Sequence, residues 1–366
     1  MRKSTQSAFF CLLIVALFLR PEHLWSQSGA DSKLVEAAKK EREVVWYTTT
    51  NLETSRVLAD VFQKKYPYIN LVFYRATVRP LINRVLLEAR SGKYDWDVLS
   101  GGGEMFTPMA EKGLLAQYRS PETRMIDEDL VDKQSYWTAY TVGTFVLGFN
   151  KRLVRQQDVP TTYDGLLDPK WKGQKIAIDT SAGILHALMP VWGREKTLSY
   201  FRQLAAQNPV VKGSTSVIAQ LLIAGEMPIG ISLAHLYELN IGKGAPIDWL
   251  ALEPAVVRVI PVMLGAKSRH PNGGKLFYDF LVGKEGQEII RSFNRPTVRR
   301  DVLPNPPRLI QGYRRVTMYP EAYKNLEETQ KLYNHLQFAL KRFAILALSC
   351  AKVCRIRCVK NEKVCF

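Results

Sequence analysis

A run of small polar residues follows an apolar stretch near the start of the chain. The apolar stretch is Val44–Tyr47, and Thr49, Thr50 and Asn51 lie in the polar run behind it. Their hydroxyl and amide groups can donate hydrogen bonds to the oxygens of an anion. The run therefore indicates one wall of a site that holds a polar solute by hydrogen bonding.

Two later loops offer similar groups. Ser100 and Gly102 belong to a Ser-Gly-Gly-Gly run that leads into a predicted helix. Backbone N–H groups at a helix start attract anions, because the helix dipole is positive there. Thr180 and Ser181 stand at an equivalent place further along the chain. Each loop also has a purely structural alternative, since Ser and Thr often cap helices and glycine runs often make tight turns.

Three larger side chains complete the predicted ligand-binding set: His235, Tyr237 and Arg75. His235 could donate to a carboxylate or a phosphate, and a histidine can change its charge near neutral pH. Arg75 follows the second predicted strand and could pair with an oxyanion through two parallel hydrogen bonds. The structural alternatives are a histidine whose hydrogen bonds are satisfied within the core and an arginine on the surface.

Strands and helices alternate along the chain, which predicts a parallel sheet. The candidate residues fall at the carboxyl ends of predicted strands, where ligands bind in open α/β sheets. One helix is expected over Glu104–Lys112, behind the glycine run, and another over Tyr319–Leu336.

Two long β-rich runs, Thr138–Phe149 and Ala255–Met263, separate two α/β units that have no flexible linker between them. The second run could cross back to the first unit. We therefore expect an α/β protein with two lobes joined by crossing strands. The expected lobes are residues 31–142 with 257–300, and residues 143–256 with 301–335.

The first 30 residues have the pattern of an export signal. Positively charged residues precede the apolar run Ala8–Leu19, which is short for a membrane span. Small residues at Ser28 and Ala30 suit a signal peptidase, so cleavage is expected after Ala30 or after Ser28. An uncleaved membrane anchor is the alternative. Residues 31–335 lack cysteine, which agrees with an oxidising compartment such as the periplasm.

The formal net charge is +17, but much of the excess lies near the two ends. Residues 336–366 form a basic tail with cysteines at 350, 354, 358 and 365. Zinc sites usually have more closely spaced cysteine pairs, so no metal is predicted, and the tail is interpreted as a disordered extension or an altered chain end. The mildly basic central region suits an anionic solute, and no nucleic-acid-binding motif accompanies it.

Six short segments occur in an order that resembles a known family: Val44–Thr48, Glu88–Gly92, Lys112–Ala116, Leu167–Gly173, Ala224–Pro228 and Lys284–Ile290. From about Leu34 to Asn334, the chain resembles the periplasmic solute-binding proteins of ABC transporters, in the branch that includes ferric-ion-binding proteins. The resemblance implies a type II binding-protein fold that closes on a small solute and delivers it to an ABC permease in the inner membrane. It also implies a monomer that needs no cofactor.

The ferric branch holds iron through a histidine, a glutamate and a tyrosine pair. Here the histidine position falls in Thr48–Asn51, and the glutamate position falls near Gly102, two residues before Glu104. The tyrosine pair falls on His235–Leu236, with Tyr237 next. Because the tyrosine pair is replaced, tyrosine-type iron coordination is not expected, and the polar groups of the loops favour a small anionic solute instead. Direct ferric-ion binding is the alternative, as is iron presented with a chelating anion.

Signatures of common enzymes are missing from the sequence. We find no His-Glu-x-x-His, no Gly-x-Ser-x-Gly and no phosphate-binding loop ending in Gly-Lys-Ser/Thr. The chain is therefore predicted not to be an enzyme. An exported hydrolase is the alternative from another class, and turnover of the bound solute would distinguish it.

Overall fold

The computed structural model describes residues 32–336. The predicted export signal and the cysteines of the basic tail lie outside the described residues. None of the helices in residues 32–336 combines the length and the apolar composition that a membrane span requires.

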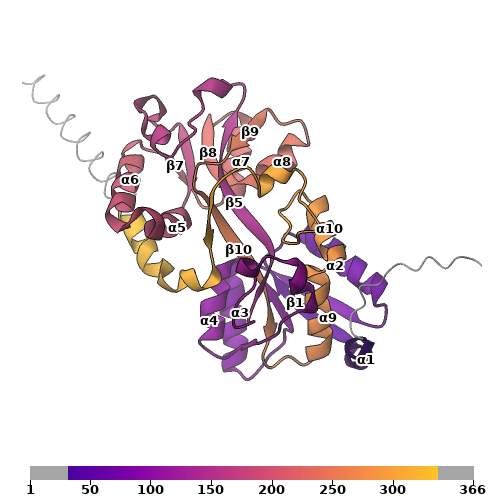
Figure 1. Cartoon of the computed structure of the whole chain (residues 1–366). Coiled ribbons are helices and arrows are strands. Elements are labelled where there is room, and N and C mark those ends of the chain that lie inside the picture. Colours follow the sequence, from indigo (N-terminus) through magenta and orange to yellow (C-terminus); the bar gives the residue numbers. More distant parts are fainter. Residues whose placement is uncertain (1–31, 337–366) are drawn as a thin grey trace, which may run out of the picture.

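The first lobe is an α/β unit in the lower half of Figure 1. β1 (Glu43–Thr48) pairs in parallel with β2 (Asn70–Arg75) on one side and with β3 (Val98–Ser100) on the other. The helices of this lobe are α1 (Ser32–Glu41), α2 (Leu52–Lys65), α3 (Val78–Arg90), α4 (Phe106–Ala110), α9 (Pro271–Val282) and α10 (Lys284–Ser292). The parallel sheet expected from the alternation of strands and helices is confirmed for these three strands.

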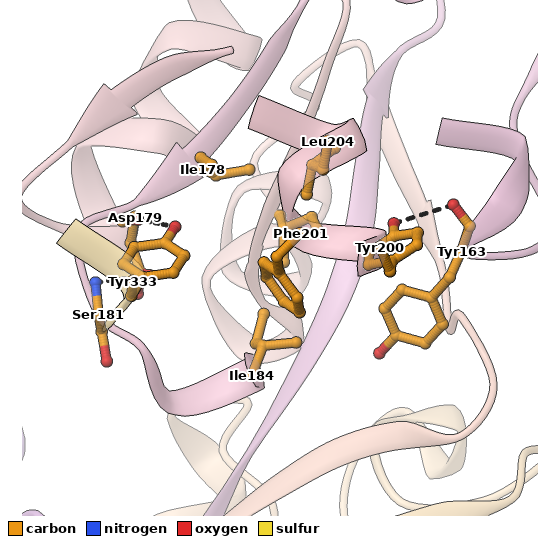
Figure 2. A pocket seen from close by; sticks show the side chains of 10 residues that line it. Tyr163, Ile178, Asp179, Ser181, Ile184, Tyr200, Phe201, Leu204 and Tyr333 are labelled. Atoms are coloured by element: carbon orange, nitrogen blue, oxygen red, sulfur yellow. Dashed lines mark hydrogen bonds between the residues drawn. The ribbon is translucent and has the colours of Figure 1, made fainter. Parts of the chain in front are cut away.

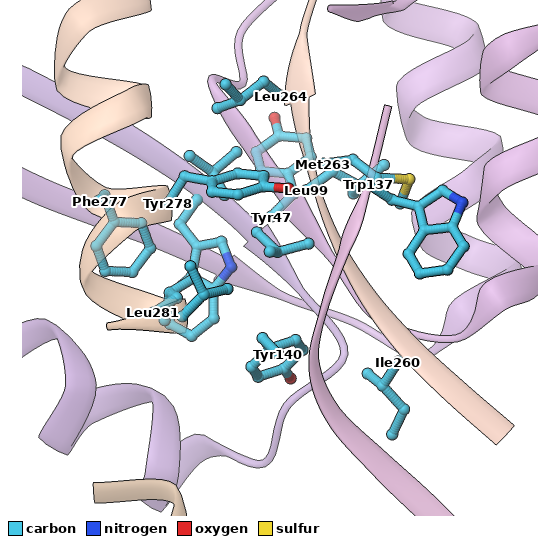
Figure 3. Packing of buried hydrophobic residues seen from close by; sticks show 14 of the residues in the cluster. Tyr47, Leu99, Trp137, Tyr140, Ile260, Met263, Leu264, Phe277, Tyr278 and Leu281 are labelled. Atoms are coloured by element: carbon cyan, nitrogen blue, oxygen red, sulfur yellow. The ribbon is translucent and has the colours of Figure 1, made fainter. Parts of the chain in front are cut away.

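Aromatic side chains fill much of the core of the first lobe. The ring of Trp46 on β1 lies 5.1 Å from the ring of Phe277 on α9, and Phe62 on α2 lies 5.0 Å from the same ring. Figure 3 shows Phe277 beside Tyr278 and Leu281 of α9, which pack toward the strands. This packing joins the amino-terminal strands to a helix from much later in the chain.

The second lobe repeats the plan in the upper half of Figure 1. β6 (Ile176–Asp179) pairs in parallel with β7 (Val210–Lys212) and with β8 (Ile229–Leu233). Its helices are α5 (Gly183–Trp192), α6 (Arg194–Ala206), α7 (Thr215–Ala224) and α8 (Ala234–Ile241). α7 ends at Gly225, whose φ of 78° lies in the left-handed region that glycine adopts at the end of a helix.

Two long antiparallel strands, β5 (Thr138–Asn150) and β10 (Ala255–Gly265), run from one lobe into the other. β5 pairs with β10 through its first half, and with β8 and β9 (Ile247–Leu250) through its second half. β10 pairs with β11 (Arg315–Met318) near its start and with β3 and β4 (Leu115–Ala116) near its end. These strands unite the described strands into one sheet, in which the order is β2-β1-β3-β10-β5-β8-β6-β7.

The buried residues form one cluster in the first lobe and two in the second. The first-lobe cluster contains residues from Ala38 to Val142 and from Val257 to Val298. The second-lobe clusters contain residues from Phe145 to Val256 and from Leu309 to Leu336. Since each lobe has its own core, the residues between them are free to form a ligand site.

The segment after β11 contacts both lobes. The 3₁₀ helix η8 (Pro320–Asn325) packs against α4 and against the 3₁₀ helix η1 (Gly103–Met105) of the first lobe. A helix over residues 326–336 follows and lies beside α5 of the second lobe (Figure 1). The expected helix over Tyr319–Leu336 is therefore 3₁₀ in its first part.

Two details differ from the sequence predictions. The helix expected over Glu104–Lys112 is divided into η1 and α4, and it stops at Ala110 because Gly113 takes a φ of 63° and turns the chain. β9 and β11 were not predicted from the sequence. Both are short strands of four residues, and they pair with the crossing strands β5 and β10.

Candidate functional site

The loop after β1 carries polar groups that face β5 and β3. The hydroxyl of Thr50 is buried and is hydrogen-bonded to the hydroxyl of Tyr140 on β5. Asn51 caps α2, since its side-chain oxygen accepts the backbone N–H of Thr54 at 2.8 Å. Thr49 comes before Thr50 and Asn51 in the same loop, next to the end of β3, and is half-buried. Asn51 therefore acts as the N-cap of α2.

Ser100 supports the wall from inside the sheet. Its Oγ accepts the Nε1–H of Trp46 at 2.8 Å and is hydrogen-bonded to Oγ1 of Thr48 at 2.9 Å. The side chain is fully buried. Ser100 therefore orders the carboxyl ends of β1 and β3, and its hydroxyl is already engaged within the protein.

Gly102 and Glu104 form the end of this wall. Gly102 precedes η1 and is half-buried, as is Glu104. A Cβ on Gly102 would stand 2.2 Å from Oε2 of Glu104, so glycine leaves the space that this carboxylate occupies. Oε2 of Glu104 is a buried atom with no hydrogen-bond partner in the described protein. The glutamate is therefore placed at the strand end, with acceptor capacity left over.

The opposite wall contains the loop after β6. Thr180 and Ser181 are both exposed. Oγ of Ser181 accepts the N–H of Gly183 at 3.1 Å, at the start of α5, and its own N–H donates to Oδ1 of Asp179 at 3.1 Å. Ser181 therefore orders the start of α5, while the hydroxyl of Thr180 remains exposed to solvent.

His235 lies at the start of α8, directly after β8, with 9% of its surface exposed. Its Nδ1 atom is buried and has no hydrogen-bond partner among the described residues. The structural alternative of a satisfied core histidine is therefore wrong for Nδ1. Burial lowers the pKa of His235 well below its usual value, and the positive charges of Arg295 and Arg258 lower it further.

Tyr237 points away from this site into the core of the second lobe. Its side chain is fully buried, and its hydroxyl donates to the carbonyl of Gly230 at 2.8 Å. The ring occupies the space above Gly148, where an added Cβ would stand 2.2 Å from Cζ. Two residues along a helix turn a side chain to a different face, so Tyr237 is corrected to a core residue.

Arg75 also lies apart from the interlobe residues. It ends β2, the edge strand of the first lobe, and its side chain is exposed. The structural alternative of a surface arginine therefore describes it better than the predicted ligand role.

The charges of two arginines that were not among the predicted site residues, Arg258 and Arg295, act on His235. Arg258 lies on β10, where its guanidinium carbon is 5.6 Å from the centre of the Phe145 ring. Arg295 follows α10 and is half-buried. The Nε atoms of both are buried without a hydrogen-bond partner in the described protein. The sequence did contain a signal that could have identified Arg258 as a functional residue, because it is the only charged residue in the otherwise apolar strand Ala255–Gly265.

The two arginines are electrostatically coupled. Burial lowers the pKa of Arg295, and the charge of Arg258 lowers it further. Burial raises the pKa of Asp179, at the end of β6, to about 6, although the charge of Arg258 opposes that rise. The charge of Arg258 therefore acts on Arg295, His235 and Asp179.

An aromatic and aliphatic pocket opens beside Asp179 and Ser181 (Figure 2). Its walls include Phe201 and Tyr200 from α6. Tyr333, from the helix over residues 326–336, closes one side through a hydrogen bond from its hydroxyl to the carbonyl of Asp179 at 3.0 Å. The pocket therefore lies inside the second lobe, behind the loop that contains Thr180.

Metal-ligating side chains do not gather in the described protein. Across residues 32–336, no group of three or more His, Cys, Asp or Glu side chains could hold a metal ion. Burial raises the pKa of the Tyr237 hydroxyl above its usual value, which disfavours the phenolate that would bind a hard metal ion. The donor set thus differs from the tyrosine pair that a ferric site of the implied kind uses.

Two lobes joined by long crossing strands give the fold of the type II periplasmic binding proteins. The model of the bacterial extracellular solute-binding proteins matches residues 96–310, and the chain belongs to this family.

Solved structures of low sequence identity share the fold. Iron-bound HitA from Pseudomonas aeruginosa has a TM-score of 0.71 at 19% identity, covering 80% of this chain and 99% of that chain. AfuA from Actinobacillus pleuropneumoniae, with fructose-6-phosphate bound, has a TM-score of 0.67 at 23% identity, covering 80% of this chain and 96% of that chain. At these identities the likeness supports the fold alone.

Curated relatives carry different names. An uncharacterized protein of Haemophilus influenzae is 28% identical over 269 residues, which cover 69% of this chain and 76% of that protein. The Fe(3+)-binding periplasmic protein of Serratia marcescens is 25% identical over 209 residues, covering 54% of this chain and 59% of its own length. A Salmonella typhi protein named as a putative 2-aminoethylphosphonate-binding periplasmic protein is 25% identical over 225 residues, which cover 57% of this chain and 64% of that protein.

Proposed function

We propose that this protein captures a small anion between its lobes as the periplasmic component of an ABC importer. The observation that carries the proposal is the pair of cations Arg258 and Arg295 beside the neutral His235, a set that we call the cationic group. Two of its members keep buried Nε–H donors without a partner. Unpaired buried arginines are costly, and a bound anion would supply the missing acceptors and the opposite charge.

Both lobes contribute to the proposed ligand set. Thr49 and the backbone of Gly102 lie on the first-lobe side, Thr180 and His235 lie on the second-lobe side, and Arg258 lies on a strand that joins them. Bending of the crossing strands would open and close the cleft, as in other hinged binding proteins. In this proposal the solute is released unchanged.

The export and delivery steps also belong to the proposal. Residues 1–30 would direct the chain to the periplasm, where it would act as a monomer. The closed form would dock on an inner-membrane ABC permease. Neither nucleic acid nor a resident cofactor has a role in this scheme.

Direct binding of bare ferric ion is a weaker candidate. Two arginines within the cleft repel a trivalent cation, and Tyr237 uses its hydroxyl inside the core. Iron that arrives with a chelating anion would meet the same arginines through that anion, so this form of cargo stays compatible with the proposal.

Native mass spectrometry of the protein, exported and purified without refolding, tests the proposed function. We expect a co-purified organic or phosphorus-containing anion, lost in the Arg258→Ala variant. An iron adduct without an organic anion would overturn the preference for an anion. Conversion of the bound molecule by the purified protein would instead support the exported hydrolase.

A further inference from the structure

We infer that the solute carries a cationic amine beside its anionic group, and that Glu104 accepts this amine. The inference rests on the proposed function, because it names a second charge on the same bound solute. It gives Glu104 the role of selecting between anions with and without an amine.

The first observation is the state of the Glu104 carboxylate. It folds over Gly102, and its Oε2 atom is buried without a partner among residues 32–336. No ion pair joins Glu104 to any cation in that part of the chain. An unpaired carboxylate oxygen in a closed site is costly, and a donor on the ligand would relieve that cost.

The second observation places Glu104 and the cationic group in one cleft. Burial raises the pKa of the Tyr323 hydroxyl, the charge of Glu104 raises it further, and the charge of Arg258 lowers it. Both charges therefore act on the same buried phenol. Tyr323 itself lies against Gly103, next to Glu104 in the sequence. β10, which carries Arg258, packs against both η1, which contains Glu104, and η8, which contains Tyr323.

A solute with two opposite charges matches this arrangement. Two arginines suit a doubly charged phosphate or phosphonate group, since a guanidinium donates paired hydrogen bonds to such oxygens. One carboxylate suits a primary ammonium. An anion that lacks the amine would leave Glu104 unpaired and would bring its own negative charge toward that carboxylate.

Calorimetric titration of the full protein with matched pairs of compounds tests the inference. One pair is 2-aminoethylphosphonate and propylphosphonate, and the other is phosphoethanolamine and propyl phosphate, so that a methyl group replaces the ammonium in each. We expect the amine-bearing member of at least one pair to bind about 10-fold more tightly or better. The Glu104→Gln variant should reduce this ratio to within about 2-fold without weakening the isostere that lacks the amine.

The Glu288→Gln variant is the matched control. Glu288 lies on α10 of the same lobe with an exposed side chain, so the variant makes the same change in charge away from the cleft. It should keep the wild-type ratio. A persistent preference in Glu104→Gln would overturn the role of Glu104.

The results separate this inference from the proposed function. Equal affinity for both members of each pair, abolished by Arg258→Ala, would overturn the inference and leave the anion site in place. If the folded wild-type protein bound none of the four compounds, the inference would also fail. If inorganic phosphate and citrate failed to bind as well, the proposed function would fail with it.

Discussion

Tyr323 lies so closely against Gly103 that a Cβ added to the glycine would stand 2.7 Å from Cε2 of the ring. The two residues come from distant parts of the chain. Gly103 begins η1 behind β3 of the first lobe, and Tyr323 belongs to η8, which leads into the helix that packs on the second lobe. The absence of a side chain at residue 103 therefore allows Tyr323 to pack against η1 of the first lobe.

The Gly103→Ala variant should weaken anion binding by about 10-fold while the lobes stay folded, because the methyl group displaces Tyr323 and loosens the contact between η8 and η1. Calorimetric titration gives the affinity, and thermal unfolding checks the fold. Gly213→Ala is the matched control, since a Cβ there meets nothing within 4 Å. An unchanged affinity in Gly103→Ala would show that the contact does not limit closure.

Arg258→Ala should reduce anion affinity by about 100-fold or more, because truncating one partner of a buried charge pair typically costs 2–5 kcal/mol. Arg75→Ala should change the affinity by less than about 2-fold, since Arg75 is exposed at the edge of the sheet. Titration of both variants at one ionic strength makes the comparison. Equal losses in the two variants would restore Arg75 to the ligand set.

Tyr237→Phe should lower the free energy of unfolding by about 1 kcal/mol and leave anion affinity unchanged. The stability effect follows from losing the hydrogen bond to the carbonyl of Gly230 in the core. Urea unfolding and titration measure the two quantities separately. A loss of affinity without a loss of stability would contradict the assignment of Tyr237 to the core.

His235 should make the ligand-free protein less stable in acid. Its pKa is lowered in the folded state, so the unfolded chain takes up a proton near pH 6.5 before the folded protein does. Stability attributable to this residue is complete above pH 6.5 and falls by up to about 1.4 kcal/mol for each pH unit below it. Urea unfolding at several pH values should give His235→Gln a shallower slope than the wild type. The same dependence of unfolding free energy on pH in both proteins would contradict the lowered pKa of His235.

Asp279 gives a pH effect of the opposite sign. Burial raises its pKa from 3.8 to about 6, although its hydrogen bonds with Ser120 and Tyr118 oppose the rise. The ionised form therefore destabilises the folded protein above pH 6. Asp279→Asn should stabilise the protein at pH 8 by up to about 3 kcal/mol, a gain that shrinks as pH falls from 6 toward 3.8. Urea unfolding at pH 8 and pH 5 checks this, and a variant less stable at pH 8 would refute it.

Much of the fold follows from local patterns in the sequence. The alternation of apolar strands and amphipathic helices identifies most elements of both lobes, since side-chain periodicity is set by the backbone of each element. The long buried runs at β5 and β10 likewise indicated strands that cross between lobes. The same local patterns placed Thr49, Gly102, Thr180 and His235 at strand ends.

The sequence by itself determined the two-lobed α/β plan and the polar character of the strand ends, because both depend on residues close together in the chain. Only the tertiary structure decided which side chains meet in the cleft. It brings Arg258 and Arg295 to His235, sets Tyr323 against Gly103, and turns Tyr237 into the core. The energy of two charges depends on the distance between them, and the fold sets that distance. Which charged groups become neighbours is therefore decided only when the strands cross and the lobes pack.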